Sequence, residues 1–218
     1  LMSGGRLTVI FGLGYRPSEY QLMGKDWNSR GKIMDDCIQT LLDAWTGKPF
    51  QYRGETHQIT PSPLTKPHPF IMIGGTSKVA ARRAARFGLP LSPAAHMPEL
   101  EAYYYEQCEL NGTQGFCAMP DNDTHMTFVA EDPDKAWDEL GQYFFNEASV
   151  YAKWQTSDIS SAVHSHATTP EELKEEGIYQ ILTPAEAAKL DRIVHHPLCG
   201  GMPLDKAGES LHLSGDAL

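Results

Sequence analysis

The apolar positions of the chain form short, nearly continuous runs, separated by stretches in which apolar residues recur every three or four positions. The runs lie at residues 7–13, 70–73, 89–92, 125–130 and 192–196. Runs of this kind are typical of strands in a parallel sheet, and they predict five strands. The first run, residues 7–13, is expected to be buried on both faces. The spacing between them is typical of amphipathic helices. The alternation of strand and helix therefore predicts an α/β fold with a parallel sheet.

The helical stretches carry start signals. Asn28 or Ser29 is expected to cap a helix that ends before Gly47, and Pro133 or Asp134 to begin a long one. Further helices are predicted at residues 98–110, 170–177 and 184–190. A weakly amphipathic tail follows the last strand.

Two segments depart from this alternation. Residues 50–60 have Tyr-Arg-Gly-Glu at their centre and predict a small hairpin outside the main sheet. Residues 154–169 are rich in Ser, Thr and His and show little periodicity. They are interpreted either as a mobile loop over a site or as a solvated linker.

The stretch from residue 69 to residue 90 predicts a buried strand, a tight turn and a helix. The turn reads Gly74, Gly75, Thr76 and Ser77. The two glycines let the backbone approach a ligand closely, and Thr76 or Ser77 can cap the helix while its first N–H groups face an anion. We interpret this turn as a phosphate cradle. The alternative is a strand-to-helix turn that uses these residues for geometry alone.

Composition limits the classes of function. The chain has 218 residues, 41% hydrophobic and 21% charged, with a formal net charge of −10. This balance indicates a globular protein with one ordinary-sized domain and argues against nucleic acid or an anionic membrane as a partner. No run reaches transmembrane length and no signal peptide is visible. The four scattered cysteines have no metal-site spacing and suggest a reduced, cytoplasmic protein without a disulfide framework.

Several segments resemble one family in order and spacing. The segments GGRLTVIFGLGYRPSEYQLMG, NSRGKIMDDCIQTLLDAWTGKPFQYRG and PSPLTKPHPFIMIGGTSKVAARRAARFGLP are similar to the middle of bacterial luciferase-like flavin-dependent monooxygenases. The segments VAEDPDKAWDELG and HHPLCGGMPLDKAGESL resemble the later part of that family. The pair WTGKPFQYRG and IGG-T-S is the most specific element of the resemblance.

The resemblance implies a (β/α)₈ TIM barrel that binds FMN, or in one branch the deazaflavin F420, at the carboxyl ends of its strands. Residues 7–13 would then be the fourth strand. We expect residues 1–218 to be a single, N-terminally incomplete barrel domain, units 4 to 8, with strands 1 to 3 absent from this chain. The strand count agrees, because five strands cannot close an eight-stranded barrel.

The resemblance also implies the cofactor-binding residues. Arg30 matches a family arginine that pairs with the flavin phosphate, and Ser77, with Gly74, Gly75 and Thr76, matches the phosphate cradle. Gly14 and Tyr15 are expected to line the flavin pocket. The residue-based alternatives are a surface role for Arg30 and a packing role for Tyr15. No catalytic residue can be assigned, because the family's catalytic His belongs to the early strands.

Other polar residues receive structural interpretations. Arg82, Arg83 and Arg86 are expected on a solvated helix face. Adjacent residues on a strand point to opposite faces, so His195 and His196 are not expected to share a metal ion. The pair of glycines at 200 and 201 either lets backbone approach a ligand or makes a turn.

Three hypotheses for function follow. The resemblance favours an oxidoreductase that uses reduced FMN and O₂ to oxygenate a small organic substrate, with F420-dependent hydride transfer as the alternative. A second hypothesis is an inactive fragment or phosphate-binding module, and a third is a barrel that acts on a sugar phosphate. Exposed strand edges predict a homo-oligomer or a partner chain that fills the gap.

Overall fold

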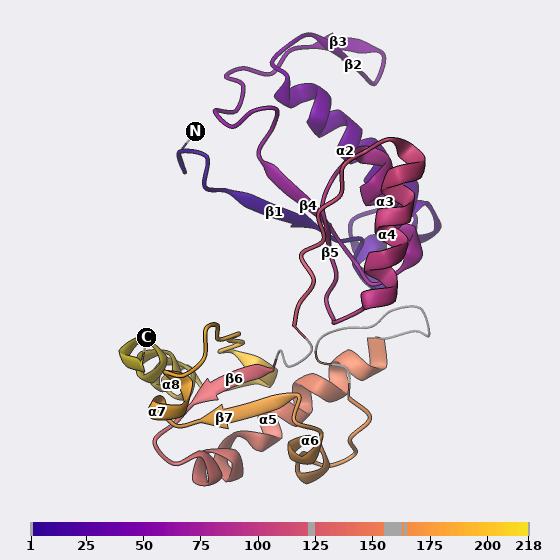
Figure 1. The fold of residues 1–218 in the computed structure, drawn as a ribbon. Helices are drawn as coiled ribbons and strands as arrows, with labels where there is room; N and C mark the ends of the chain where they lie inside the picture. Colours follow the sequence, from indigo (N-terminus) through magenta and orange to yellow (C-terminus); the bar gives the residue numbers. More distant parts are fainter. Residues whose placement is uncertain (1, 122–124, 155–162, 164, 218) are drawn as a thin grey trace. The chain divides into compact units, whose positions relative to one another are not determined.

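The computed structural model describes residues 2–121, 125–154, 163 and 165–217. The chain divides into two compact units, unit 1 (Leu1–Met119) and unit 2 (Pro120–Leu218), both visible in Figure 1. Each unit has its own cluster of buried hydrophobic side chains. The prediction of a single domain over residues 1–218 stays a prediction.

Unit 1 is built on a three-stranded parallel sheet. Its strands are β1 (Thr8–Phe11), β4 (Phe70–Gly74) and β5 (Leu91–Ser92), in the order β1-β4-β5. The register pairs Phe11 with Ile73 and Ile73 with Leu91. Three of the predicted strands and their parallel direction are thus confirmed.

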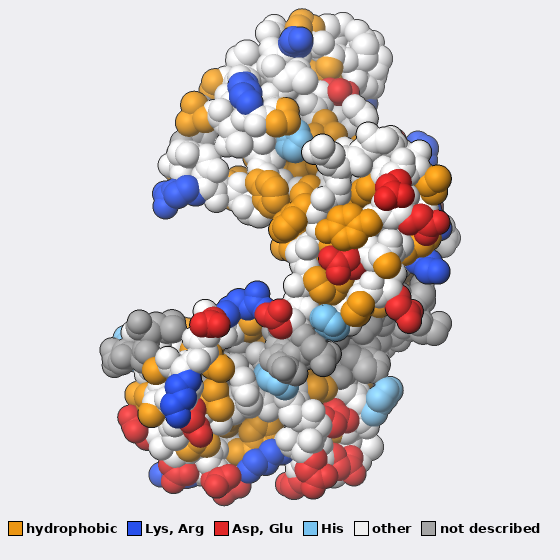
Figure 2. Space-filling model, viewed as in Figure 1, with side chains coloured by type: hydrophobic (Ala, Val, Ile, Leu, Met, Phe, Trp, Pro, Cys, Tyr) orange, Lys and Arg blue, Asp and Glu red, His pale blue; other side chains and the backbone are white. Residues whose placement is uncertain are grey.

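Strand β1 differs from its prediction. The continuous apolar run predicts burial on both faces, but Thr8 and Ile10 are exposed. The physical reason is its position, since among the described residues β1 pairs only with β4 and forms an edge. Figure 2 shows hydrophobic side chains gathered on the face of unit 1 over β1 and β4. The central strand β4 instead buries Ile71, Met72 and Ile73.

The helices of unit 1 begin close to the predicted signals. They are α1 (Pro17–Leu22), η1 (Trp27–Ser29), α2 (Arg30–Trp45), α3 (Lys78–Phe87) and α4 (Pro98–Asn111). Helices α3 and α4 lie side by side (Figure 1). Helix α3 packs against the sheet through small side chains, which allow a close approach: Ala80, Ala81, Ala84 and Ala85.

The predicted hairpin is confirmed. Strands β2 (Phe50–Tyr52) and β3 (Glu55–His57) pair antiparallel. Arg53 and Gly54 between them both have positive φ, at 52° and 84°. Two such residues form the type of turn that matches the twist of a hairpin.

Unit 2 contains a two-stranded parallel sheet of β6 (Met126–Val129) and β7 (Tyr179–Leu182). Its helices are α5 (Pro133–Trp154), α6 (Pro170–Glu176), α7 (Pro184–Ala187), η2 (Cys199–Gly201) and α8 (Leu204–Ala217). Phe144 of α5 stacks on Tyr179 at 5.1 Å and meets Phe128 edge-on at 4.8 Å. These rings form the centre of the core of unit 2.

The predicted last strand is wrong. In the described part of the chain, residues 192–196 pair with β6 only through an isolated bridge between Met126 and Val194. Pro197, the next residue, has no backbone N–H with which to continue the pairing. The partner of β6 is β7, which the sequence analysis did not predict. Apart from the β2–β3 hairpin, the described strands form two parallel sheets and no closed barrel, and the partial barrel stays a prediction. Most of the loop predicted at residues 154–169 lies outside the described residues.

Candidate phosphate-binding site

Residues 74–77, here called the glycine turn, link β4 to α3. Gly75 has φ +146°, and its N–H donates to the Ser92 carbonyl at 3.3 Å. A Cβ at Gly74 would lie 2.9 Å from Cγ2 of Ile10, and one at Gly75 would lie 2.9 Å from Cβ of Ala80. A side chain at either position would collide with its neighbour, so both positions require glycine. At these two positions the turn therefore has bare backbone.

Ser77 is the N-cap of α3. Its backbone is extended, and its Oγ accepts a hydrogen bond from the Ala80 N–H at 3.2 Å. The prediction that Thr76 or Ser77 caps this helix is confirmed for Ser77. The hydroxyl can still donate its own proton, and the N-terminus of a ten-residue helix carries partial positive charge. The turn can therefore offer an anion a hydroxyl, backbone N–H groups and a helix dipole.

Arg30 is the first residue of α2 and is half-buried. Its Nη1 donates to the Trp27 carbonyl at 3.0 Å, and its Cζ lies 3.9 Å from the centre of the Trp27 ring. The aromatic face thus supplies a favourable contact for a cation at a helix N-terminus, where the dipole is unfavourable. The phosphate contact of Arg30 stays a prediction.

Gly14 and Tyr15 follow β1 as residues 74–77 follow β4. Because β1 and β4 are parallel and Phe11 pairs with Ile73, both segments leave the sheet at the carboxyl ends of the strands. Gly14 has φ +71°, and Tyr15 is half-buried. The segment after them is ordered, since the Tyr20 hydroxyl donates to the Leu13 carbonyl at 2.6 Å. The structure therefore places Gly14 and Tyr15 at the same end of the sheet as the glycine turn.

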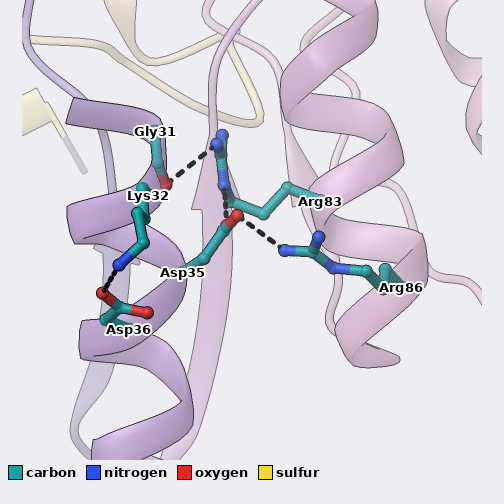
Figure 3. A network of polar contacts seen from close by, with 6 residues as sticks. All are labelled: Gly31, Lys32, Asp35, Asp36, Arg83 and Arg86. Atoms are coloured by element: carbon teal, nitrogen blue, oxygen red, sulfur yellow. Dashed lines mark hydrogen bonds and ion pairs between the residues drawn. The ribbon is translucent and has the colours of Figure 1, made fainter. Parts of the chain in front are cut away.

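Figure 3 shows how α2 and α3 are joined. Asp35 of α2 accepts hydrogen bonds from Arg83 Nε at 2.6 Å and from Arg86 Nη2 at 2.8 Å. Arg83 also donates from Nη2 to the Gly31 carbonyl at 3.3 Å. This last bond ties the first turn of α2, which carries Arg30, to the helix that begins at the glycine turn.

The prediction of a solvated arginine face is wrong for Arg83, which is 6% exposed. Arg83 can be buried because Asp35 supplies the counter-charge that a buried guanidinium requires. Burial raises the pKa of Asp35, but the hydrogen bonds and charges of Arg86 and Arg83 outweigh it, so the pKa of this carboxyl is lowered. The sequence pattern carried no signal that paired Arg83 with a residue 48 positions earlier.

Unit 2 holds a polar cluster that the sequence analysis missed. The buried carboxylate of Glu147 accepts from the Tyr179 hydroxyl at 2.8 Å, the Cys199 thiol at 2.7 Å and His196 Nδ1 at 2.9 Å. Burial, then the neighbouring Cys199 and Glu147, raise the pKa of Tyr179. Burial and the hydrogen bond to Glu147 raise the pKa of Cys199. The cluster joins α5, β7 and η2.

The residues beside this cluster clarify two expectations. The His195 ring packs near Phe128, whereas His196 contacts Glu147, so the two rings do have different surroundings. A Cβ at Gly200 would overlap the Tyr143 carbonyl oxygen. The close approach at Gly200 is therefore to the backbone of α5.

In the described part of the chain, no group of His, Cys, Asp and Glu side chains could hold a metal ion. Its helices also include none with the length and apolarity needed to cross a bilayer.

Comparison with known sequences finds one family. A family model described as luciferase-like monooxygenase matches residues 1–195. An uncharacterized protein of Mycobacterium tuberculosis is 40% identical over 88 residues, which is 38% of this chain and 30% of that protein. The FMNH(2)-dependent dimethylsulfone monooxygenase of Pseudomonas putida is 30% identical over 92 residues, 38% of this chain and 25% of that enzyme. The matched segment thus spans less than a third of either relative.

Two solved structures share the fold. The monooxygenase RslO1 from Streptomyces bottropensis aligns with a TM-score of 0.64 and 19% identity, over 100% of this chain and 69% of that one. The oxygenating constituent of 3,6-diketocamphane monooxygenase from Pseudomonas putida, solved with FMN, aligns with a TM-score of 0.56 and 15% identity. That alignment covers 85% of this chain and 60% of the other.

Proposed function

Because the chain belongs to the luciferase-like monooxygenase family, we propose that it holds the phosphate end of FMN in a flavin-dependent monooxygenase. The enzyme would oxidise a small organic substrate with reduced flavin and O₂. Support comes from the related dimethylsulfone monooxygenase, described as FMNH(2)-dependent, and from the FMN complex of a structural neighbour.

The glycine turn is the observation that carries this proposal. A phosphate dianion needs several donors and little steric obstruction, and the turn combines two sterically required glycines with the capped N-terminus of α3. These features support the assignment of a phosphate to the glycine turn. Ser77 would donate its hydroxyl proton to a phosphate oxygen while its Oγ continues to cap α3.

Arg30 would add charge to the same phosphate. Its guanidinium uses one N–H on the Trp27 carbonyl, and a guanidinium has five. Trp27 would hold the arginine plane in place, and the Arg83 bond to the Gly31 carbonyl would keep the first turn of α2 near α3. Gly14 and Tyr15 would border the ring of the flavin.

A bound flavin supplies the redox chemistry of the family, and the residues of this chain bind and orient it. No residue here is proposed as catalytic. F420-dependent hydride transfer is the alternative within the same fold, because the proposed contacts address a phosphate and do not distinguish the two rings.

Partners are proposed from the edge of β1 with which no other described strand pairs. The backbone groups along this edge and the exposed Ile10 favour a homo-oligomer or a partner chain that adds strands there. Sedimentation velocity over a range of protein concentrations measures this association. Purely monomeric behaviour at every concentration would contradict it.

The test of the proposed site compares FMN with riboflavin, which lacks the phosphate. Binding to the 218-residue chain is followed by quenching of flavin fluorescence. Ser77→Ala and Arg30→Ala should each weaken FMN binding about tenfold, as expected for a lost hydrogen bond to a charged group, and leave riboflavin binding unchanged. Arg53→Ala, which removes an exposed arginine from the hairpin of the same unit, is the matched control. Equal FMN affinity in all four proteins would refute the assignment.

A further inference from the structure

A second polar feature of unit 1 lies among its helices. A cavity of about 310 Å³ is lined by residues of α2, α3 and α4, with none from the strands. We call it the arginine cavity. Its polar lining residues come from all three helices: Asp35, Arg82, Arg83, Arg86, Gln107 and Asn111.

The charges in the arginine cavity do not balance. Asp35 is its only carboxylate among the lining residues, and it is shared by Arg83 and Arg86, as Figure 3 shows. The bond from Arg82 Nη1 at 3.1 Å goes to a neutral group, the Tyr103 hydroxyl. Three guanidinium groups and one carboxylate leave an excess of two positive charges. This local excess stands in a chain whose formal net charge is −10.

The spacing along α3 makes this excess unfavourable without an anion. Arg82 and Arg86 are four residues apart and Arg83 and Arg86 three apart, so Arg86 is a neighbour of both other arginines on the helix surface. Like charges at these spacings repel each other. Because the single carboxylate of Asp35 is shared by Arg83 and Arg86, it compensates only part of the repulsion between Arg82 and Arg86.

The same two side chains have donors to offer. Arg86 is 53% exposed at its side chain and uses Nη2 on Asp35, while Arg82 is exposed. Each guanidinium has five N–H donors in a planar fork, the geometry that matches carboxylate and phosphate oxygens. The amides of Gln107 and Asn111 on α4 add neutral polar groups opposite α3.

We propose that the arginine cavity binds the phosphate or carboxylate group of a small solute, held by Arg82 and Arg86. The pair Arg83–Asp35 forms the fixed floor of this site and positions Arg86. The site is separate from the glycine turn, since Arg82 and Arg86 lie five and nine residues beyond Ser77, roughly 7.5 and 13.5 Å along the helix axis. The inference therefore does not depend on the proposed function.

The experiment titrates the folded 218-residue chain with sodium phosphate and, separately, with sodium acetate, against sodium chloride at matched ionic strength. The side-chain Nε–H signals of Arg82 and Arg86 are followed by NMR and assigned from the variants Arg82→Gln and Arg86→Gln. We expect saturable shifts of both signals with phosphate, with acetate or with both, and none with chloride. The responding anion identifies the chemical group.

Each single variant should weaken the response of the remaining arginine about tenfold, because one charge-assisted hydrogen bond is lost. Arg53→Gln removes a positive charge outside the arginine cavity and should leave the response unchanged. Ser77→Ala should also leave it unchanged, which separates this site from the glycine turn. Three outcomes would overturn the proposal: shifts that do not saturate, shifts that chloride reproduces, and loss of the response in Ser77→Ala.

Discussion

In each unit, one carboxylate joins elements that are distant in the sequence, and the two carboxylates have different partners. Asp35 of unit 1 lies between two arginines, and its pKa is lowered by them against the effect of burial. Glu147 of unit 2 is buried, and two of its partners are neutral groups whose pKa values are raised, Tyr179 and Cys199. Charge joins two helices in unit 1, whereas hydrogen bonds in an aromatic core join helix, strand and turn in unit 2. We expect the stability of unit 1 to depend on pH through Asp35. We expect the stability of unit 2 to fall when a substitution disturbs the packing or the hydrogen bonds around Glu147.

The largest effect is expected from Gly200→Ala in unit 2. Its Cβ would overlap the Tyr143 carbonyl oxygen, and Gly200 has φ +56°. Because the obstructing atom is backbone, the change should cost more than about 4 kcal/mol and unfold the region around Glu147. Hydrogen exchange of the unit 2 amides, measured by mass spectrometry, reports this loss.

Gly201→Ala is the matched control for that change. Gly201 also has positive φ, at +85°, but nothing lies within 4 Å of a Cβ built there. Its cost should be about 1 kcal/mol, the cost of the backbone conformation alone. Similar protection factors in the two variants would show that the approach of η2 to α5 is not tight.

A smaller loss is expected when the acceptor is removed and the backbone is kept. Glu147→Ala leaves the Tyr179 hydroxyl and the Cys199 thiol buried without their shared acceptor. The expected cost is about 3 kcal/mol in the free energy of unfolding, measured by urea titration of unit 2 signals. Glu147→Gln keeps one oxygen acceptor and should recover at least half of that loss. If Glu147→Ala were as stable as the native chain, the hydrogen bonds of Glu147 would not stabilise unit 2.

The sequence predicted unit 1 better than unit 2, for a physical reason. The glycine turn, the Ser77 cap and the hairpin at residues 50–57 depend on residues adjacent in the chain. Such local signals can be seen in a sequence without knowledge of the fold. The family assignment rests on local segments of both units, of which WTGKPFQYRG and IGG-T-S in unit 1 are the most specific, and it is confirmed by the family match over residues 1–195.

The misses depend on distant residues. Glu147 and Cys199 are 52 positions apart, and only the packing of α5 against η2 brings them together. The sequence analysis predicts the last strand at residues 192–196 and none at Tyr179–Leu182. In the structure, Tyr179 of β7 fills the core against Phe144, while Val194 makes only a bridge. Tertiary packing therefore decides which segment forms the strand.

The smallest of these effects is expected at the charged junction of unit 1. Asp35→Asn leaves Arg83 buried without its counter-charge and should cost about 2 kcal/mol at neutral pH, measured by urea titration of unit 1 signals. Asp36→Asn is the matched control on the neighbouring residue in Figure 3. Asp36 is 67% exposed and pairs with Lys32, so its loss should change the free energy of unfolding by no more than about 0.5 kcal/mol.

The dependence on pH sharpens this contrast between the two aspartates. Because the folded-state pKa of Asp35 lies below its unfolded value, about 3.9, its contribution is fully present above that pH and is lost as the pH falls through the folded pKa. The native chain should therefore lose stability in unit 1 as the pH falls below about 4. Asp35→Asn should lose less over the same range, because the titrating group is gone. Urea titrations at a series of pH values measure both slopes, and parallel slopes in the two proteins would show that the arginines do not hold Asp35 ionised.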